Sequence, residues 1–494
     1  MSSAKQAVQP AKMQQTEADH SRGQGLPAVI QRSKPASNSI AAVLEALKEQ
    51  FGERFSTSDS VRLAHGKGES WHPPELPDCV CYPESTGEVA SVMALCHEHK
   101  VPVIPFGVGT SLEGHTLAPL GGVSVDLSRM NNILEVNTED MDCRVQAGVT
   151  RKQVNEYIRD TGLFFPIDPG ADATIGGMTA TRASGTNAVR YGTMKDNVIS
   201  LTFVNAKGEI VRTGTRARKS SAGYDLTRLL VGSEGTLGVI TEVGLKLHGM
   251  PEAMMAAVVS FPDLGSAVDT VIQTIQLGIP MARIELVDEG YMEAINNYSK
   301  LDNPVRDTLF LEFHGTENSV KEQVELFAEI ASENGGSDLE WARKEEDRNR
   351  LWQARHDAYW AILAKYPGKQ GFTTDVCVPI SQLAEIIRYV REQLEDSFLE
   401  GHIVGHAGDG NFHMTFCIDQ TDQKQVDEVY RVNALLVNRA IEMGGTCTGE
   451  HGVGTGKLKY LRKEHGDEAL AMMQAIKLAC DPENILNPLK TVAV

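Results

Sequence analysis

The sequence has few of the features that mark nucleic-acid-binding or membrane-spanning proteins. It carries no excess of basic residues, since 47 Lys and Arg stand against 66 Asp and Glu and the formal net charge is -19. Such a balance disfavours nucleic acid and anionic membranes as partners. The longest apolar runs, such as residues 253–261, fall far short of the roughly 20 residues that span a bilayer. We therefore expect no nucleic-acid partner and at most peripheral contact with a membrane.

The eight cysteines also lack a pattern. They form no CxxC pair or zinc-finger spacing, and no hydrophobic signal region precedes them, which favours a reducing compartment. Residues 1–38 are polar and rich in Gln, Ser, Ala and Pro, a composition that predicts a disordered leader. The few basic residues of this leader leave a mitochondrial transit peptide open as an alternative.

The chain does have a globular composition, with 41% hydrophobic and 23% charged residues, and its 494 residues are too many for one ordinary core. Apolar periodicity predicts helices over residues 39–52 and 86–100. Between about residues 76 and 250, short β-like runs alternate with glycine-rich turns, including a hairpin turn at residues 206–208. Longer helical segments follow Met250, so we expect a second domain to begin there.

Three glycine-rich segments lie in the strand-rich part, at residues 105–114 (PFGVGTSLEG), 168–198 and 223–241. Glycines let backbone amides approach an anion closely, and Thr and Asn side chains can hydrogen-bond a cofactor. The first segment lacks the third glycine of the nicotinamide fingerprint, and the later HGVGTGKLK has Leu458 where a P-loop needs Ser or Thr. One such loop alone is typical of an ordinary turn, but three in one domain predict a dinucleotide site.

Histidines gather near the end of the chain. GHAGDGNFH contains His406 and His413 on either side of a Gly-Asp-Gly turn, and TCTGEHGVG, residues 446–454, contains Glu450 and His451. β-like runs flank the first turn, so the chain can reverse and bring the two imidazoles together, and we expect residues 446–454 to form a strand leading into a turn beside them. Two His and one Glu suit zinc, manganese or iron. A bare His pair at this spacing is typical of a polar turn, but the Glu-His pair favours a metal site.

The three glycine-rich segments, in this order, resemble the flavin-binding domain of the vanillyl-alcohol-oxidase, or para-cresol methylhydroxylase (PCMH), superfamily. GHAGDGNFH and TCTGEHGVG are similar to the cap domain of D-2-hydroxyacid dehydrogenases, and RHDAYWAILAKYPGKQGFTTDVCVP and DPENILNPLK resemble the cytochrome-type D-lactate dehydrogenases. The resemblance implies an α+β fold, with a PCMH-type FAD-binding domain of two α+β subdomains and an α+β cap (substrate) domain with an antiparallel sheet. The implied order is a disordered leader (1–38), an N-terminal helical segment (39–75), the FAD-binding domain (76–252), the substrate and metal cap domain (253–480) and a C-terminal segment that returns to the FAD domain (481–494).

The resemblance also implies roles for individual residues. The metal ligands match His406, His413 and Glu450. The catalytic base matches His451, and the arginine that binds the substrate carboxylate matches Arg355, although the helical pattern alone favours a solvated arginine there. Contacts to noncovalently bound FAD are assigned to Gly107, Gly109, Thr110, Ser111, Thr174, Gly176, Gly177, Gly185, Asn187, Tyr191, Gly192, Glu234, Gly238, Ile240 and Asn487.

These roles fit the oxidation of a D-2-hydroxy acid. A divalent cation, zinc or manganese, lowers the pKa of a bound hydroxyl oxygen, an imidazole accepts the proton, and FAD accepts hydride at N5. The expected reaction is D-lactate to pyruvate, because Thr373 and Thr415 stand where relatives acting on D-2-hydroxyglutarate carry Lys and Asn for a second carboxylate. His402 matches no functional position and is expected to be structural.

The implied partners are the small 2-hydroxy acid and an electron acceptor, which is a cytochrome c, a quinone or an electron-transfer flavoprotein. The implied location is the cytoplasm or the periphery of the inner membrane, and the mitochondrion if the source is eukaryotic. Three alternatives stay open: the FAD subunit of a glycolate oxidase complex, a metal-dependent hydrolase without flavin, and a flavin-binding scaffold without catalysis. A flavin band that D-lactate bleaches would distinguish the dehydrogenase from the last two.

Overall fold

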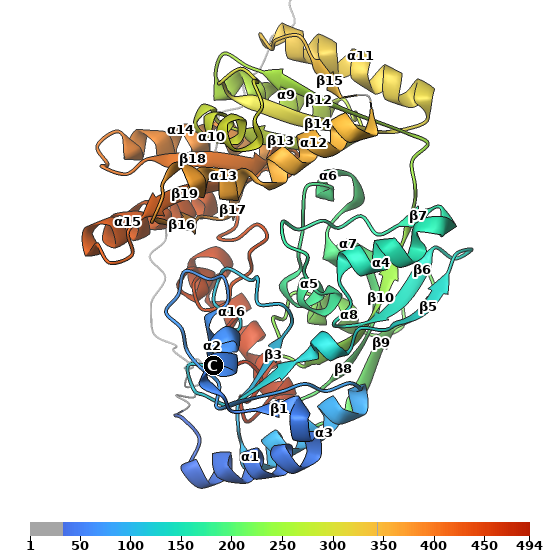
Figure 1. Ribbon diagram of the computed structural model, residues 1–494, viewed down its shortest axis with the longest axis vertical. Helices are drawn as coiled ribbons and strands as arrows, with labels where there is room; N and C mark the ends of the chain where they lie inside the picture. Colours follow the sequence, from blue (N-terminus) through green and yellow to red (C-terminus); the bar gives the residue numbers. More distant parts are fainter. Residues whose placement is uncertain (1–32, 343) are drawn as a thin grey trace, which may run out of the picture.

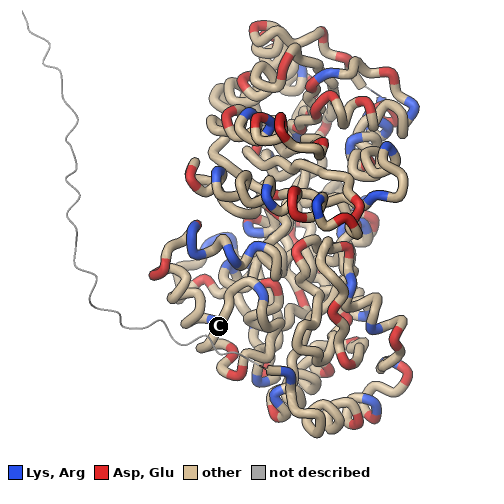
Figure 2. The backbone as a smooth tube through the Cα atoms, turned by 90° about the vertical axis from the view of Figure 1, so that its left-hand side faces the viewer, with Lys and Arg blue, Asp and Glu red and all other residues tan. Residues whose placement is uncertain are grey.

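The computed structural model describes residues 33–342 and 344–494, so most of the predicted leader, residues 1–32, lies outside the described residues. The described chain forms two lobes, which Figures 1 and 2 show one above the other. The lower lobe of Figure 1 holds a four-stranded, a five-stranded and a two-stranded sheet, and the upper lobe holds an eight-stranded sheet. Figure 2 shows acidic and basic residues interspersed over both lobes. Among the described helices, none is both long enough and apolar enough to cross a bilayer.

The four-stranded sheet has the order β1–β2–β4–β3, in which β2, β4 and β3 run parallel. Its strands and the helices beside it are β1 (Phe55–Ser56), β2 (Cys79–Cys81), β3 (Val103–Phe106), β4 (Val123–Asp126), α1 (Ser37–Phe51), α2 (Asp59–Lys67) and α3 (Thr86–His99). The helix predicted over residues 39–52 corresponds to α1. It begins earlier than predicted, at Ser37, because the Ala36 carbonyl already accepts from the amides of Ser39 and Ile40. It ends before Gly52, whose φ of 53° stops it as predicted.

The five-stranded sheet is antiparallel, with the order β5–β6–β10–β8–β9. The hairpin predicted at residues 206–208 is confirmed, since β8 and β9 pair and Gly208 has a φ of 85°. The elements of this part are β5 (Ile133–Asn137), β6 (Asp142–Gln146), α4 (Arg151–Ile158), α5 (Ile175–Thr181), α6 (Ala188–Tyr191), α7 (Met194–Asn197), β8 (Val198–Val204), β9 (Ile210–Gly214), α8 (Leu226–Leu230) and β10 (Val239–Lys246), with the short pair β7 (Leu163–Phe164) and β11 (His248–Gly249).

The eight-stranded sheet of the upper lobe is antiparallel, with the order β15–β12–β14–β13–β18–β19–β16 and β17 paired to β19. Its strands are β12 (Ala253–Ser260), β13 (Met281–Val287), β14 (Thr308–Gly315), β15 (Glu340–Ala342), β16 (Gln370–Thr373), β17 (Val376–Cys377), β18 (Gly401–His406) and β19 (Asn411–Ile418). The antiparallel sheet and the α+β class expected for the cap are confirmed.

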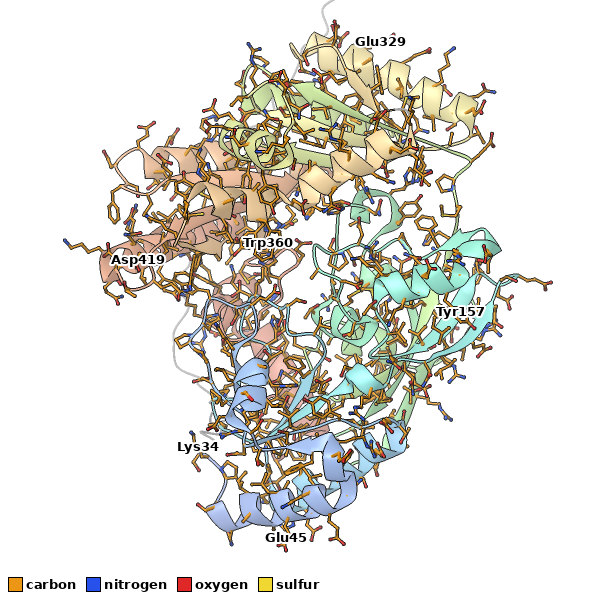
Figure 3. The ribbon with its side chains drawn as sticks, viewed as in Figure 1. Lys34, Glu45, Tyr157, Glu329, Trp360 and Asp419 are labelled. Atoms are coloured by element: carbon orange, nitrogen blue, oxygen red, sulfur yellow. The ribbon has the colours of Figure 1, made fainter. Side chains whose placement is uncertain are left out.

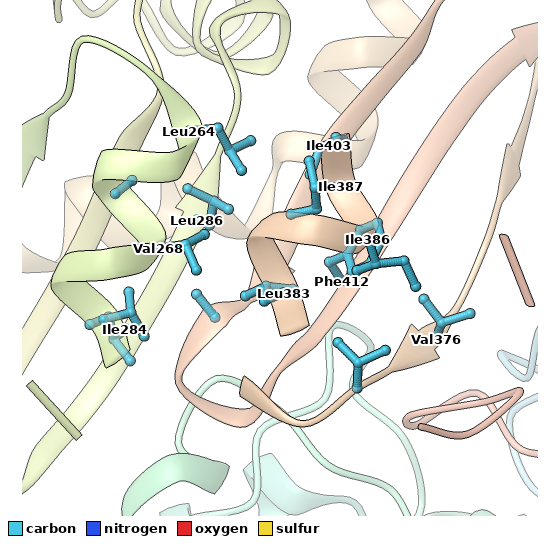
Figure 4. Packing of buried hydrophobic residues seen from close by; sticks show 14 of the residues in the cluster. Leu264, Val268, Ile284, Leu286, Val376, Leu383, Ile386, Ile387, Ile403 and Phe412 are labelled. Carbon is cyan, nitrogen blue, oxygen red and sulfur yellow. The ribbon is translucent and has the colours of Figure 1, made fainter. Parts of the chain in front are cut away.

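Helices cover both faces of this sheet, because side chains alternate along each strand. One face packs on α9 (Leu264–Gln276), α11 (Glu317–Glu333), α14 (Leu383–Leu394) and α15 (Gln423–Glu442), and the other on α10 (Glu289–Ser299), α12 (Glu345–His356) and α13 (Ala358–Lys365). Figure 4 shows the first face, where Leu264 and Val268 of α9 and Leu383 of α14 meet Leu286 and Phe412 of the sheet. Each such buried side chain contributes roughly 1.5–3 kcal/mol to stability.

The C-terminal part of the chain returns to the lower lobe. α16 (Leu461–Cys480) lies there in Figure 1. Beyond it the backbone joins the edge of the four-stranded sheet, since the Val103 amide donates to the Ile485 carbonyl over 2.8 Å and the Asn487 amide to the Val103 carbonyl over 2.9 Å. The chain is thus already in the lower lobe before residue 481. The domain boundaries given in the sequence analysis stay predictions.

Candidate active site

A cleft of about 1510 Å³ opens where the two lobes meet. Its lining combines the glycine-rich loops of the lower lobe with the His-rich strands of the upper lobe, and Trp360, labelled in Figure 3, lies at this junction. Pockets for single drug-sized ligands measure roughly 300–1,000 Å³. The cleft is therefore large enough for an extended dinucleotide with a small substrate beside it.

Two glycine-rich loops contact each other along this cleft. At Gly107, which follows β3, an added Cβ would stand 2.4 Å from Thr174 Oγ1, so the approach requires glycine. Gly109 has a φ of +73° and lies against the ring of Phe106. Thr174 caps α5 by accepting from the Gly177 amide. The loops thus form a cradle of backbone and small side chains that suits a large, rigid cofactor.

Most of the predicted FAD contacts line the cleft: Gly107, Gly109, Thr110, Ser111, Thr174, Gly177, Gly185, Glu234 and Asn487. Two of these also hold the protein together. The Glu234 carboxylate accepts from the backbone amides of Val453 and Gly454, and the Asn487 side-chain amide donates to the Glu234 carbonyl over 2.7 Å. These two side chains therefore help to hold the loop that carries Glu450 and His451, and they also lie where a cofactor could contact them.

The other predicted contacts do not line the cleft: Gly176, Asn187, Tyr191, Gly192, Gly238 and Ile240. The glycines among them are packed where a Cβ would meet a neighbour, namely Ala147 at Gly176, Asp196 at Gly192 and Phe203 at Gly238. Ile240 is buried within β10. These four residues pack closely inside the protein. Close packing of backbone can therefore require glycines in the same way as a ligand-binding loop does.

Asn187 and Tyr191 instead bind the upper lobe. The Asn187 side chain donates to the Pro166 carbonyl and accepts from Arg283 Nε at 3.0 Å. The Tyr191 hydroxyl lies 2.8 Å from His314 Nδ1. Both residues therefore connect the two lobes, and direct contact between them and a cofactor stays a prediction without support from the lining of the cleft.

The predicted metal ligands do come together. His406 ends β18 and His413 lies within β19, and the two strands form a hairpin. Glu450 Oε1 lies 3.3 Å from His406 Nε2 and 3.2 Å from His413 Nε2. Tetrahedral zinc, with bonds of roughly 2.0–2.1 Å, places its ligand atoms about 3.3–3.4 Å apart. The three side chains therefore fit a divalent cation.

Hydrogen bonds orient the imidazoles of His406 and His413 so that Nε2 of each ring lies toward Glu450. His413 Nδ1 lies 3.0 Å from the Thr374 carbonyl, which can only accept, so Nδ1 carries the proton and Nε2 keeps its lone pair. His406 Nδ1 lies 2.8 Å from the Glu285 carboxylate, which orients it in the same way. Such partners behind metal-ligating histidines fix the ring and its tautomer.

The prediction that residues 446–454 form a strand leading into a turn is wrong about the strand. Only an isolated bridge joins Thr446 to Cys377, and the rest is loop. The backbone amides of Glu450 and His451 donate to the buried Asp375 carboxylate at 3.0 and 2.9 Å, so no neighbouring strand receives them. Burial would raise the pKa of Asp375, but nearby His451 and His413 lower it, and the group remains an anion.

His451 lies flat on His413, with ring centroids 4.8 Å apart and an interplanar angle of 6°. His451 lines the cleft, and its buried Nδ1 has no hydrogen-bond partner among the described residues. Asp375, His413 and His451 form a second group near enough to hold a metal. Asp375 is the weaker ligand, because its oxygens already accept from two backbone amides, the Thr448 hydroxyl and the Asn411 amide.

Arg355 of α12 lines the cleft beside this cluster and is only 8% exposed. Its Nη2 donates to Glu285 Oε2 over 2.5 Å, while its buried Nε has no partner in the described part of the chain. Burial would raise the pKa of Glu285, but His406 and Arg355 leave it below the ordinary value. Sequence reasoning missed both Glu285 and Asp375; the signal for Glu285 was a charged residue inside the apolar run MARIELV.

Three hydroxyls line the cleft near the histidines. The Tyr291 hydroxyl donates to Thr415 Oγ1 over 2.8 Å, and Thr415 Oγ1 lies 3.1 Å from Thr373 Oγ1. His402 lies outside the lining and is buried, with Nε2 2.9 Å from the Tyr366 hydroxyl. Burial lowers its pKa to about 4, so the ring is neutral, in agreement with a structural role.

Comparison with known proteins gives the class. A family model for the FAD binding domain matches residues 77–214, and one for the C-terminal domain of FAD linked oxidases matches residues 250–491. A probable mitochondrial D-lactate dehydrogenase of Danio rerio is 48% identical and covers 94% of this chain and 95% of its own. A mitochondrial D-lactate dehydrogenase [cytochrome] of Arabidopsis thaliana is 47% identical, covering 91% and 80%. The crystal structure of p-cresol methylhydroxylase has a TM-score of 0.75 at 15% identity, covering 93% and 98%.

The chain is thus an FAD-dependent oxidoreductase with the PCMH-type fold, as its loops predicted. Within that class it belongs to the family of cytochrome-type D-lactate dehydrogenases, in the D-2-hydroxyacid dehydrogenase branch. The likeness to p-cresol methylhydroxylase shows the fold alone. The alternative of a hydrolase without flavin is wrong, because both halves of the chain match FAD-linked oxidases.

Proposed function

We propose that this chain oxidises D-lactate to pyruvate in the cleft between its lobes, with noncovalent FAD and a divalent metal, zinc or manganese. One observation carries the proposal: His406, His413 and Glu450, whose ligand atoms lie close enough to hold a metal, line the same cleft as Arg355 and His451. Buried polar atoms rarely lack a hydrogen-bond partner in folded proteins, but among the described residues Arg355 Nε and His451 Nδ1 have none.

The side chains divide the work as follows. Arg355 binds the substrate carboxylate through its free N–H groups, because a guanidinium matches that group in shape and charge. His451 accepts the hydroxyl proton on its imidazole ring. His406, His413 and Glu450 hold the cation, which when bound lowers the pKa of the substrate hydroxyl. FAD, when bound, supplies the two-electron acceptor for the hydride from C2.

The chain's own residues also favour a small monocarboxylate. Thr373, Thr415 and Tyr291 bond to one another by their hydroxyls, so their polar atoms are already paired. Neither threonine offers the positive charge that a second substrate carboxylate would need. D-Lactate carries a methyl group in place of a second carboxylate, so it would bring no unpaired charge to these hydroxyls.

We further propose that the electrons pass to a cytochrome, as the name of the Arabidopsis relative states for that protein. Both relatives described above are mitochondrial by name, and the same location is proposed if this chain comes from a eukaryote. Purified protein should reduce cytochrome c in the presence of D-lactate. Reduction of a quinone analogue or an electron-transfer flavoprotein, without cytochrome c reduction, would assign a different acceptor.

The central test is optical. Purified protein should show a flavin band that acid precipitation releases, and anaerobic D-lactate should bleach it faster than glycolate or D-2-hydroxyglutarate. A flavin band that D-lactate leaves unchanged would refute the proposed reaction. Faster bleaching by glycolate would instead favour the glycolate oxidase alternative.

A further inference from the structure

β13 carries two charged residues in an otherwise apolar strand, MARIELV. Arg283 and Glu285 lie two positions apart and therefore point to the same face of the sheet. The side chain of Glu285 is only 1% exposed. A buried carboxylate costs stability unless its oxygens find strong partners, so the partners of Glu285 indicate its purpose.

Each oxygen of Glu285 binds a different part of the active site. Oε1 lies 2.8 Å from Nδ1 of His406, at the end of β18, and Oε2 accepts from Nη2 of Arg355, in α12, at 2.5 Å. His406 belongs to the proposed metal triangle, whereas Arg355 belongs to the proposed carboxylate site. One buried anion thus joins two groups that come from different elements.

We propose that Glu285 is a positioning residue shared by the metal site and the substrate-carboxylate site; this inference rests on the proposed function. Through Oε1 it keeps the proton of His406 on Nδ1, which leaves the Nε2 lone pair for the metal. Through Oε2 it holds Nη2 of Arg355, which fixes the guanidinium beside the cleft and leaves its other N–H groups for the substrate. A single side chain therefore sets how His406 and Arg355 lie relative to each other.

The variant Glu285→Gln separates the two contacts. Arg355 can only donate, so the amide oxygen takes its place opposite Nη2, and the amide NH2 then faces His406. His406 Nδ1 must become the acceptor, which moves the ring proton to Nε2, the nitrogen that faces Glu450. Metal affinity should fall about 10- to 100-fold, while KM for D-lactate at saturating metal should stay within about threefold.

The variant Glu285→Ala removes both contacts. It should lose metal affinity to the same extent and, at saturating metal, also raise KM for D-lactate about tenfold or more, because Arg355 loses the group that holds it. Glu312→Gln is the matched control. Glu312 is a buried carboxylate opposite Arg283 on β14, and it contacts Arg283 and His314. That variant should keep both metal affinity and KM within about threefold of the parent chain.

Metal affinity is measured on the flavin-loaded protein by competition with a chelator, and KM by anaerobic flavin reduction. Unchanged metal affinity in Glu285→Gln, or unchanged KM in Glu285→Ala, would overturn the shared role. Equal losses in Glu312→Gln would also overturn it, since they would reflect any buried charge. If the parent chain binds no divalent metal or is not reduced by D-lactate, the proposed function itself fails, before any variant is compared.

Discussion

Replacing His451 with alanine tests the assignment of roles in the site. Within residues 33–342 and 344–494, two groups could hold a metal, and they share His413: one includes His406 and Glu450, the other Asp375 and His451. If the first group is the metal site, His451 is free to act as the base. The variant should then keep both FAD and metal and lose flavin reduction.

The size of the effect follows from the contacts of His451. Its ring stacks on His413, a contact worth about 0.5–1.5 kcal/mol, and its Nδ1 has no partner that truncation would leave unpaired. A positioned general base contributes about 10²- to 10⁴-fold in rate, or roughly 2.7–5.5 kcal/mol of barrier. The variant should therefore lose more transition-state stabilisation than folding free energy.

The assay is anaerobic stopped-flow reduction of the flavin band by D-lactate, with flavin and metal content measured on the same preparation. Glu450→Ala serves as the counterpart, because Glu450 lies within 3.3 Å of both imidazoles of the triangle. It should lose the metal on dialysis and keep the flavin. The two variants thus fail for different reasons, and metal content distinguishes them.

The opposite pattern would refute the reasoning. If His451→Ala loses the metal while Glu450→Ala retains it, the cation belongs to Asp375, His413 and His451, and another group must be the base. A variant lacking His451 that still reduces its flavin at the parent rate would remove His451 from the mechanism altogether.

Three further predictions concern other parts of the molecule. Dialysis against a chelator should leave the flavin band and slow its reduction by D-lactate, with recovery on adding zinc or manganese; an unchanged rate in metal-free protein would contradict a role for the cation. The double variant Thr373→Lys, Thr415→Asn should raise kcat/KM for D-2-hydroxyglutarate about tenfold or more by binding the second carboxylate, and no gain in steady-state assays would show that these positions do not set specificity. Burial lowers the pKa of Lys490 from 10.5 to about 7, so the unfolded chain binds the extra proton between these pH values and the contribution of this group to stability rises with pH across that window. Lys490→Met should flatten the rise in unfolding temperature between about pH 7 and 10, and an identical slope in the variant would show that other groups cause it.

The sequence allowed the approach of His406 to His413 to be predicted because that part of the proposed metal site is local. His406 and His413 lie on the two strands of one hairpin, so alternation of apolar residues around Gly-Asp-Gly was enough to bring them together. The Glu-His pair pointed to the same place, but the loop that carries Glu450 and His451 has no periodic pattern, and their separate roles came from the family resemblance. The loop was taken for a strand because nothing in TCTGEHGVG shows that Asp375 would receive its amides.

Glu285 could not be found in this way. It reaches His406 across 121 positions of sequence, through the pairing of β13 with β18. Strand order in an antiparallel sheet with long connections leaves little trace in local sequence. The available signal was an acidic residue in an apolar strand, which predicts a buried partner without naming it.

The glycine-rich segments show the limit of composition as a guide to ligand contacts. Gly107 and Gly176 stand in similar sequences, and both would clash if they carried a Cβ. Gly107 lines the cleft, whereas Gly176 packs against Ala147 inside the lower lobe. A requirement for close approach is visible in the sequence, but whether backbone or ligand approaches is decided by the tertiary fold.

The loop that carries Glu450 and His451 is held from both lobes. On one side, Asp375 of the upper lobe accepts from the amides of Glu450 and His451. On the other side, Glu234 of the lower lobe accepts from the amides of Val453 and Gly454 at 2.7 and 2.8 Å. Both carboxylates are buried, and bonds from backbone amides to such anions are about twice as strong as neutral ones. Because the proposed hydride transfer needs a short and fixed separation between donor and flavin, this double anchor suits a loop that carries the proposed metal ligand and the proposed base.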